Sequence, residues 1–124
     1  MKIMLINMHG LIRGTDLQIG KDADNGGQIR YVMDMAEALS QNPAVSMVYL
    51  FTRRIDDPNL DSSYNLAIES VNPKFEIRRI SCGGKRYRPI EQLWEFLDEF
   101  VTETIKHLKR YNVRPDWVHS HYGD

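Results

Sequence analysis

Two adjacent glycines, Gly26 and Gly27, end a polar loop that includes Asp22 to Asn25 and stand directly before an apolar-patterned segment. Glycines at the start of a helix let a ligand approach the backbone and leave the first N–H groups of the helix free. The helix dipole favours negative charge at that end, so a phosphate or a polarised sugar hydroxyl is the expected ligand. A tight turn with no ligand explains the glycine pair equally well.

Two basic segments could neutralise such a ligand. The first is Arg53-Arg54, and the second is the loop after Gly83-Gly84, which carries the cations Lys85, Arg86 and Arg88. Tyr122 could donate a hydrogen bond to a phosphate, although an aromatic ring that caps a sheet is a comparable interpretation. Solvated loop charges are the alternative for the basic residues, with only one or two of them in contact with a ligand.

Other chemistries have weaker support. Zinc could be imagined on the three histidines near strand ends and the single cysteine, which are His9, His119, His121 and Cys82. No partner carboxylate for these histidines is evident, so we expect neither a metal nor a cofactor. Cys82 lacks an identifiable base and is a poor candidate nucleophile. The glycine pair does not fit the dinucleotide-binding pattern, and no phosphate-binding Gly-Lys-Ser/Thr motif occurs.

Composition limits the class of protein. The chain has 124 residues and a formal net charge of -1, which suits one globular domain or part of one and argues against nucleic-acid binding. With one cysteine no internal disulfide can form, so a reducing, cytoplasmic location is expected. The apolar run at the N-terminus is too short for a signal peptide or a membrane span.

The periodicity of apolar residues predicts an alternation of strands and helices. Strands are predicted over residues 2–8, 45–52, 75–80 and 117–122, with a weak one near 66–71, and helices over 27–41 and 90–111. A long loop at 9–25 separates the first strand from the first helix, and loops of that length are usually functional.

This order of elements predicts an α/β fold, a Rossmann-like open parallel sheet with flanking helices. Ligands of such sheets lie outside the carboxyl ends of the strands, where the polar and basic residues of this chain gather. A sheet that stops after residue 122 would leave an apolar edge or face bare. We therefore expect residues 1–124 to be a fragment of a longer protein.

Several segments together resemble the sucrose-phosphate synthases, which are retaining glycosyltransferases of the GT-B type. The resemblance covers nearly the whole chain and is carried by segments in the family's order. They are His9-Gly10-Leu11-Ile12-Arg13-Gly14, Ile19 to Val32, Leu50-Phe51-Thr52-Arg53-Arg54-Ile55, Asp61-Ser62-Ser63-Tyr64, Ile80-Ser81-Cys82-Gly83-Gly84 and His119-Ser120-His121-Tyr122-Gly123-Asp124. Sucrose synthases share parts of this pattern.

The resemblance implies transfer of glucose from UDP-glucose to fructose 6-phosphate, giving sucrose 6-phosphate and UDP. In such enzymes an N-terminal domain mainly holds the acceptor and a C-terminal domain holds the nucleotide-sugar, so the resemblance implies that residues 1–124 are part of the N-terminal, acceptor-side domain. By resemblance, Gly26, Gly27 and Gln28 would face the sugars and the donor diphosphate. Tyr122 would contact the acceptor phosphate, and the loop from Lys85 to Arg88 would help to neutralise it.

Two departures from the family pattern matter. Pro89-Ile90-Glu91 stands where the family has Pro-Lys-Glu, so a basic acceptor contact is lost or is supplied by Arg86 or Arg88. The donor-binding and catalytic groups of the family lie beyond Asp124, so residues 1–124 alone are expected to be inactive. Sucrose synthase-like or mannosylfructose-phosphate synthase-like transfer and a free-standing sugar-phosphate-binding or regulatory module remain open alternatives.

Overall fold

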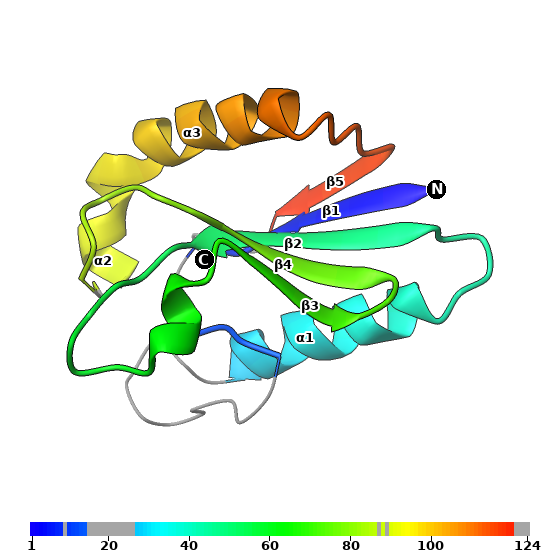
Figure 1. Ribbon diagram of the computed structural model, residues 1–124, viewed down its shortest axis with the longest axis horizontal. Coiled ribbons are helices and arrows are strands. Elements are labelled where there is room, and N and C mark those ends of the chain that lie inside the picture. The colour runs from blue at the N-terminus through cyan, green and yellow to red at the C-terminus, as the bar shows by residue number, and fades with distance from the viewer. Residues whose placement is uncertain (9, 15–26, 87, 89, 121–124) are drawn as a thin grey trace.

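A computed structural model describes residues 1–8, 10–14, 27–86, 88 and 90–120 of the chain (Figure 1). Its strands are β1 (Lys2–Ile6), β2 (Met47–Arg53), β3 (Ile68–Asn72), β4 (Phe75–Ile80) and β5 (Trp117–Ser120). Its helices are α1 (Gly27–Ser40), α2 (Ile90–Leu93) and α3 (Leu97–Arg110), with 3-10 turns η1 (Ser62–Asn65) and η2 (Trp94–Phe96).

The five strands form one sheet in the order β3-β4-β2-β1-β5. The pairings β4-β2, β2-β1 and β1-β5 are parallel, as expected for a Rossmann-like sheet, and β3 alone pairs antiparallel with β4. The predicted fold class is confirmed, with this antiparallel edge strand as a difference. Only Pro73 and Lys74 join β3 to β4, and two residues can make a hairpin but not the long crossover that parallel strands need.

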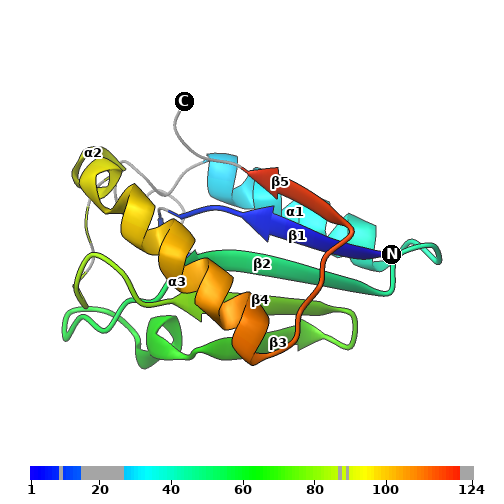
Figure 2. The same ribbon diagram turned by 90° about the horizontal axis from the view of Figure 1, so that it is seen from above.

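Alternation along the strands builds a separate core on each face of the sheet. Leu50 and Ile77 point toward α1 and pack with Ile29, Val32 and Ala36 of that helix. Neighbouring strand residues point to the other face, where α3 crosses the sheet (Figure 2) and packs through Phe100. This arrangement puts both helix layers in place and directs the carboxyl ends of β1, β2, β4 and β5 to one edge of the molecule.

The predicted continuous helix over residues 90–111 is wrong in its first half. An α-helical turn is followed by the 3-10 turn η2, and α3 begins only at Leu97. The tighter turn brings Phe96 against the loop after β4 that contains Gly83, and the centre of its ring lies 4.9 Å from the guanidinium of Arg88. From Leu97 onward the helix is favoured by Asp98 and Glu99 in its first turn and by cations in its last, which complement the dipole.

One part of the apolar surface stays exposed, as the sequence predicted. Val101 and Ile105 of α3 and both Trp117 and Val118 of β5 are between 44% and 63% exposed. Val101, Ile105 and Val118 border an apolar hollow of about 210 Å³ above Met4. In the described part of the chain, no helix has the length and apolar character needed to cross a membrane.

His107 of α3 is partly buried where this helix packs on the sheet. Its ring packs edge-on to Phe51 at 5.3 Å, and its Nε2 lies 3.1 Å from Nη1 of Arg78. Burial, together with the positive charges of Arg78 and Arg110, lowers the pKa of His107 to about 4. The imidazole is therefore neutral in the folded protein over the physiological range.

Acidification should destabilise the protein through His107. The unfolded chain binds this proton near its ordinary pKa of about 6.5, whereas the folded chain resists it down to about pH 4. Stability is therefore fully present above about pH 6.5 and decreases as the pH falls toward 4. His107→Gln should reduce the loss between pH 6.5 and 5 by on the order of 1 kcal/mol, after allowance for solvent screening. Urea unfolding at several pH values tests this, and parallel pH profiles for the two proteins would contradict it.

Candidate functional site

The basic loop after β4 is held in shape by Arg53, the last residue of β2. Its side chain is buried, and Nε donates to the carbonyl of Cys82 at 2.7 Å. One terminal nitrogen donates to the carbonyls of Gly83 and Gly84, both at 3.2 Å, and to that of Arg86. A buried guanidinium needs such acceptors, because its desolvation is otherwise unfavourable by several kcal/mol. Arg53 is therefore a structural residue and not a free ligand-binding charge.

The two glycines of this loop allow the carbonyls to converge on Arg53. Gly83 and Gly84 have φ of 65° and 81°, a conformation that other residues adopt at a cost. The amide of Gly83 donates to the carboxylate of Glu99 in α3 at 2.8 Å. A Cβ on Gly83 would lie 3.1 Å from the ring of Phe96, whereas one on Gly84 would meet no atom of the described residues closer than 3.7 Å. The loop is thus tied both to β2 and to α3.

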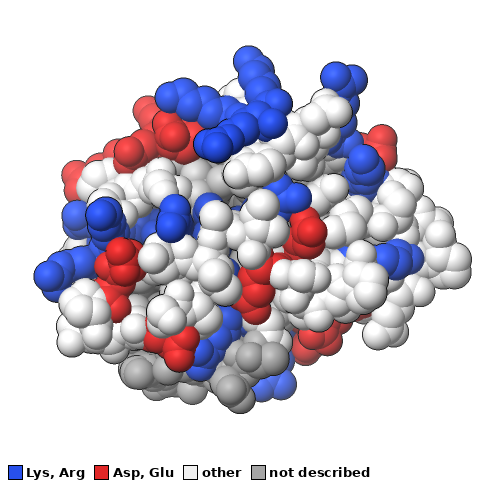
Figure 3. Space-filling model, in the orientation of Figure 1, with Lys and Arg blue, Asp and Glu red and all other residues white. Residues whose placement is uncertain are grey.

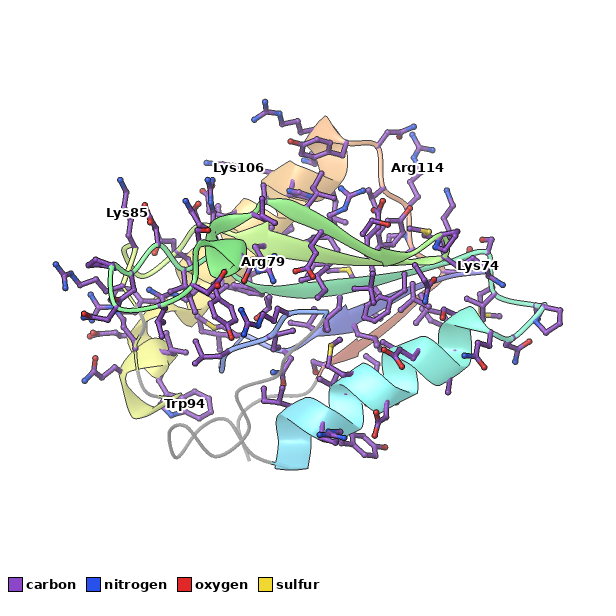
Figure 4. The ribbon with its side chains drawn as sticks, turned by 60° about the horizontal axis from the view of Figure 1, so that its bottom comes forward. Lys74, Arg79, Lys85, Trp94, Lys106 and Arg114 are labelled. Atoms are coloured by element: carbon purple, nitrogen blue, oxygen red, sulfur yellow. The ribbon has the colours of Figure 1, made fainter. Side chains whose placement is uncertain are left out.

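The three predicted cations of the loop have different environments. Lys85 and Arg86 are exposed, and neither side chain forms a hydrogen bond or ion pair among the described residues. Arg88 is partly buried, donates from Nε to the carbonyl of Gly83 at 2.6 Å, and lies over Phe96. In Figure 4, Lys85 extends away from α1, the helix that begins at Gly27. Arg88 has a packing role, which leaves Lys85 and Arg86 available to a ligand.

A hollow of about 390 Å³ opens beside this loop. It lies between the carboxyl ends of β2 and β4 and the start of α3, and its charged lining residues are Arg54, Asp56, Lys85 and Glu99. Two cations thus face two carboxylates. The sequence analysis predicted a basic rim here, whereas the lining of this hollow is electrically balanced.

The other predicted site residues are placed only in part. Gly27 begins α1, as predicted, and Gln28 is the second residue of that helix. Gly26 and Tyr122 lie outside the described residues, as do His9 and His121. The expectation that the glycine turn and the basic loop meet around one ligand therefore stays a prediction.

The metal and thiol alternatives have little support in the described part of the chain. Within it, no group of three His, Cys, Asp or Glu residues could hold a metal ion. Cys82 is buried, and this desolvation raises the pKa of its thiol to about 11. A thiol with such a pKa is protonated at neutral pH, so it is a poor nucleophile.

Sequence reasoning missed a contact made by Arg54. Its Nε donates at 2.8 Å to both the backbone carbonyl and the side-chain oxygen of Asn65 at the end of η1. The guanidinium is thereby oriented at the ends of the strands, and it lines the hollow beside the loop. Alternation along β2 could have indicated that Arg53 and Arg54 point in different directions, but the partner in η1 could not be foreseen.

No protein-family model matches the chain, but individual known proteins do. It is 37% identical to sucrose-phosphate synthase 4 of Arabidopsis thaliana over 143 residues, spanning 98% of this chain and 14% of that protein. It is 38% identical to a probable sucrose-phosphate synthase 2 of Oryza sativa subsp. japonica over 148 residues, spanning 98% of this chain and 15% of that protein. The chain is a homologue of a segment of the sucrose-phosphate synthases.

The three-dimensional comparison agrees. The structure of a sucrose-phosphate synthase from Thermosynechococcus elongatus matches with a TM-score of 0.74 at 29% identity, over 98% of this chain and 27% of that one. The resemblance predicted from the sequence motifs is thereby confirmed. The chain spans only 14–15% of the length of its curated sucrose-phosphate synthase relatives.

The two glycines of the basic loop offer a matched pair of substitutions. Gly84→Ala should destabilise the protein by about 1–2 kcal/mol, because alanine is strained at positive φ. Gly83→Ala should cost at least about 1 kcal/mol more, because its methyl group would also press on Phe96. Thermal or urea unfolding of both variants tests the order. A loop held by these contacts could not give equal losses for the two.

Proposed function

We propose that this chain is the acceptor-side part of the N-terminal domain of a glycosyltransferase that makes sucrose 6-phosphate. The reaction transfers glucose from UDP-glucose to fructose 6-phosphate and releases UDP. A C-terminal nucleotide-sugar domain, carried by the longer protein, would bind the donor and complete the active site, and residues 1–124 alone would be inactive. A cytoplasmic location fits a chain whose only cysteine is a buried free thiol.

The single observation that carries this proposal is the 35–38% identity to sucrose-phosphate synthases over 98% of the chain. The fold adds a physical reason. In open parallel sheets the ligand lies outside the carboxyl ends of the strands, and the long loop after β1 and the segment after β5 both leave from that edge. These are the segments that contain Gly26 and Tyr122.

Within the proposed site, backbone amides at the start of α1 would face the hydroxyl groups and phosphates of the two substrates. Gly26 and Gly27 would allow the close approach, and the side-chain amide of Gln28 would bind a sugar hydroxyl. Tyr122 would donate to the acceptor phosphate. Lys85, Arg86 and Arg88 would supply positive charge, with Arg86 taking the place of the family lysine where this chain has Ile90.

Retaining transfer requires that a departing diphosphate and a developing positive charge on the sugar be held together. Acceptor binding does not require those groups. The division of labour makes a prediction that separates the acceptor side from the donor side: substitutions of Lys85, Arg86 and Tyr122 should change the KM for the acceptor more than the KM for UDP-glucose.

The test is a coupled assay of UDP release by the complete protein that contains this chain, with UDP-glucose as donor. We expect release with fructose 6-phosphate, sucrose 6-phosphate as the product, and little release with fructose. If fructose served as well as its phosphate, a sucrose synthase-like activity would replace the proposed one. Release with neither acceptor would contradict the proposal.

Residue roles are tested in the same assay. Arg86→Gln should raise the KM for fructose 6-phosphate roughly ten- to a hundredfold, because it removes a charge-assisted contact. Gln28→Ala and Tyr122→Phe should also weaken acceptor use. Gln41→Ala, an exposed glutamine just past the other end of α1, is the matched control and should change nothing. Unchanged acceptor kinetics in all three site variants would remove those residues from the site.

A further inference from the structure

The short segment after β1 is anchored to the antiparallel edge of the sheet before it leads into the long loop. The carboxylate of Glu69 in β3 accepts a hydrogen bond from the Gly14 amide, with 2.9 Å between N and Oε2. Its other oxygen, Oε1, forms an ion pair with Nη2 of Arg79 in β4 at 2.7 Å. We call Glu69, Arg79 and their contacts with Ile12 and Gly14 the stem anchor.

Arg79 is the buried half of the stem anchor. Its side chain is only 1% exposed, and a guanidinium at such depth requires acceptors because its desolvation is otherwise unfavourable. Nη2 donates to the backbone carbonyl of Ile12 at 2.7 Å, and Nη1 donates to that of Leu66, just after η1, at 3.1 Å. Figure 4 shows Arg79 beside η1. Arg79 therefore holds Glu69 in place and also binds the segment after β1 directly.

Close packing around Gly14 leaves this part of the segment little room to shift. A Cβ on Gly14 would lie 2.8 Å from Oε2 of Glu69 and 3.1 Å from Cγ2 of Val71, which are both on β3. The neighbouring Arg13 lies over the ring of Tyr64 in η1, with its guanidinium carbon 5.1 Å from the ring centre. The segment is thus held by the edge hairpin and by η1 together.

The stem anchor and the start of α1 share one buried core. Ile12 packs in the same cluster as Ile29, which lies in the first turn of α1. Residues 15–26 lie outside the described residues, but the positions on either side of them, Gly14 and Gly27, are tied to the sheet and to the helix. Fixing both ends of a connection lowers the entropy that must be lost when the chain between them adopts one arrangement. The glycine pair thus depends on the stem anchor as well as on α1.

Charge at this edge favours a positional role of the stem anchor over an electrostatic one. On the face shown in Figure 3, acidic and basic side chains are interspersed over β3 and β4 and are not gathered by sign. Glu69 and Arg79 balance each other's charge, and Arg79 is closed to solvent. The pair therefore exerts little attraction on a charged ligand, and its contribution lies in where it holds Gly14.

We propose that Glu69 and Arg79 are positioning residues of the glycosyltransferase. Through the Gly14 amide and the Ile12 carbonyl they fix the stem from which the chain reaches the glycine pair at the start of α1. The inference rests on the proposed function, in which that pair faces the substrates. Neither Glu69 nor Arg79 touches a substrate. The role also gives the antiparallel strand β3 a function, because this strand supplies Glu69.

The test compares two carboxylates of the same hairpin in the complete protein. Glu69→Ala removes the acceptor of the Gly14 amide. Glu76→Ala is the matched control, because Glu76 pairs with Arg78 at 2.8 Å on the α3 face of the sheet. Glu69→Ala should raise the KM for fructose 6-phosphate and for UDP-glucose roughly three- to tenfold, since the glycine pair would face both substrates. Glu76→Ala should change either KM less than about twofold, because it leaves the stem anchor intact.

Two further measurements separate positioning from general destabilisation. Gly14→Ala keeps every charge of the stem anchor, but its methyl group would press on Glu69 and Val71, so both KM values should rise again. A merely destabilised enzyme would lose folded protein, which lowers the apparent kcat and leaves KM unchanged. Amide hydrogen exchange needs no turnover: the Gly14 amide should exchange faster in Glu69→Ala and at an unchanged rate in Glu76→Ala.

Equal KM values for the wild type and Glu69→Ala, or equal rises in Glu69→Ala and Glu76→Ala, would overturn the proposal. Unchanged exchange of the Gly14 amide in Glu69→Ala would overturn it as well. A rise in the acceptor KM alone, as for Arg86→Gln, would contradict a role exerted through the glycine pair. If the wild type released UDP with neither fructose 6-phosphate nor fructose, the proposed function would fail, and the exchange comparison would still decide whether Glu69 holds Gly14.

Discussion

The sheet edge that carries the candidate site depends on the hydrogen bonds of the buried Arg53 guanidinium. This side chain gathers the backbone carbonyls of Cys82, Gly83, Gly84 and Arg86 around one charge at the end of β2. These acceptors offset the desolvation of Arg53, and the positive φ of the glycines makes their convergence possible. Everything that projects from this loop, including Lys85 and Arg86, takes its position from that arrangement.

The same arrangement separates two chemical environments that are neighbours in the sequence. Arg53 points inward and donates to backbone carbonyls of the loop. Arg54 turns outward, is oriented by Asn65 and borders the hollow beside the loop. The fold thus gives two adjacent arginines different environments, one buried in the loop and one partly exposed at the end of the strand.

Much of the fold could be predicted because it rests on local periodicity. The apolar stripe Ile29, Val32 and Ala36 and the alternating strand at Phe75–Ile80 need no knowledge of distant residues. The interruption of the helix at Trp94–Phe96 could not be predicted, because the apolar residues of this region keep helical spacing. The tighter turn reflects the packing of Phe96 on the basic loop. The role of Arg53 was hidden for the same reason, because its acceptors are backbone atoms some 30 residues away in the chain.

Hydrogen–deuterium exchange of Arg53→Met tests the central claim most directly. The buried hydrocarbon part of the side chain is retained in this variant, while the donors to the loop are lost. We predict faster exchange of the Gly83 amide, which donates to Glu99, and of the Asp56 amide, which donates to the carbonyl of Lys85. Amides of α1 should stay protected, since that helix packs in a core cluster separate from the one that contains Cys82. Unchanged protection at Gly83 and Asp56 would contradict the claim that Arg53 holds the loop.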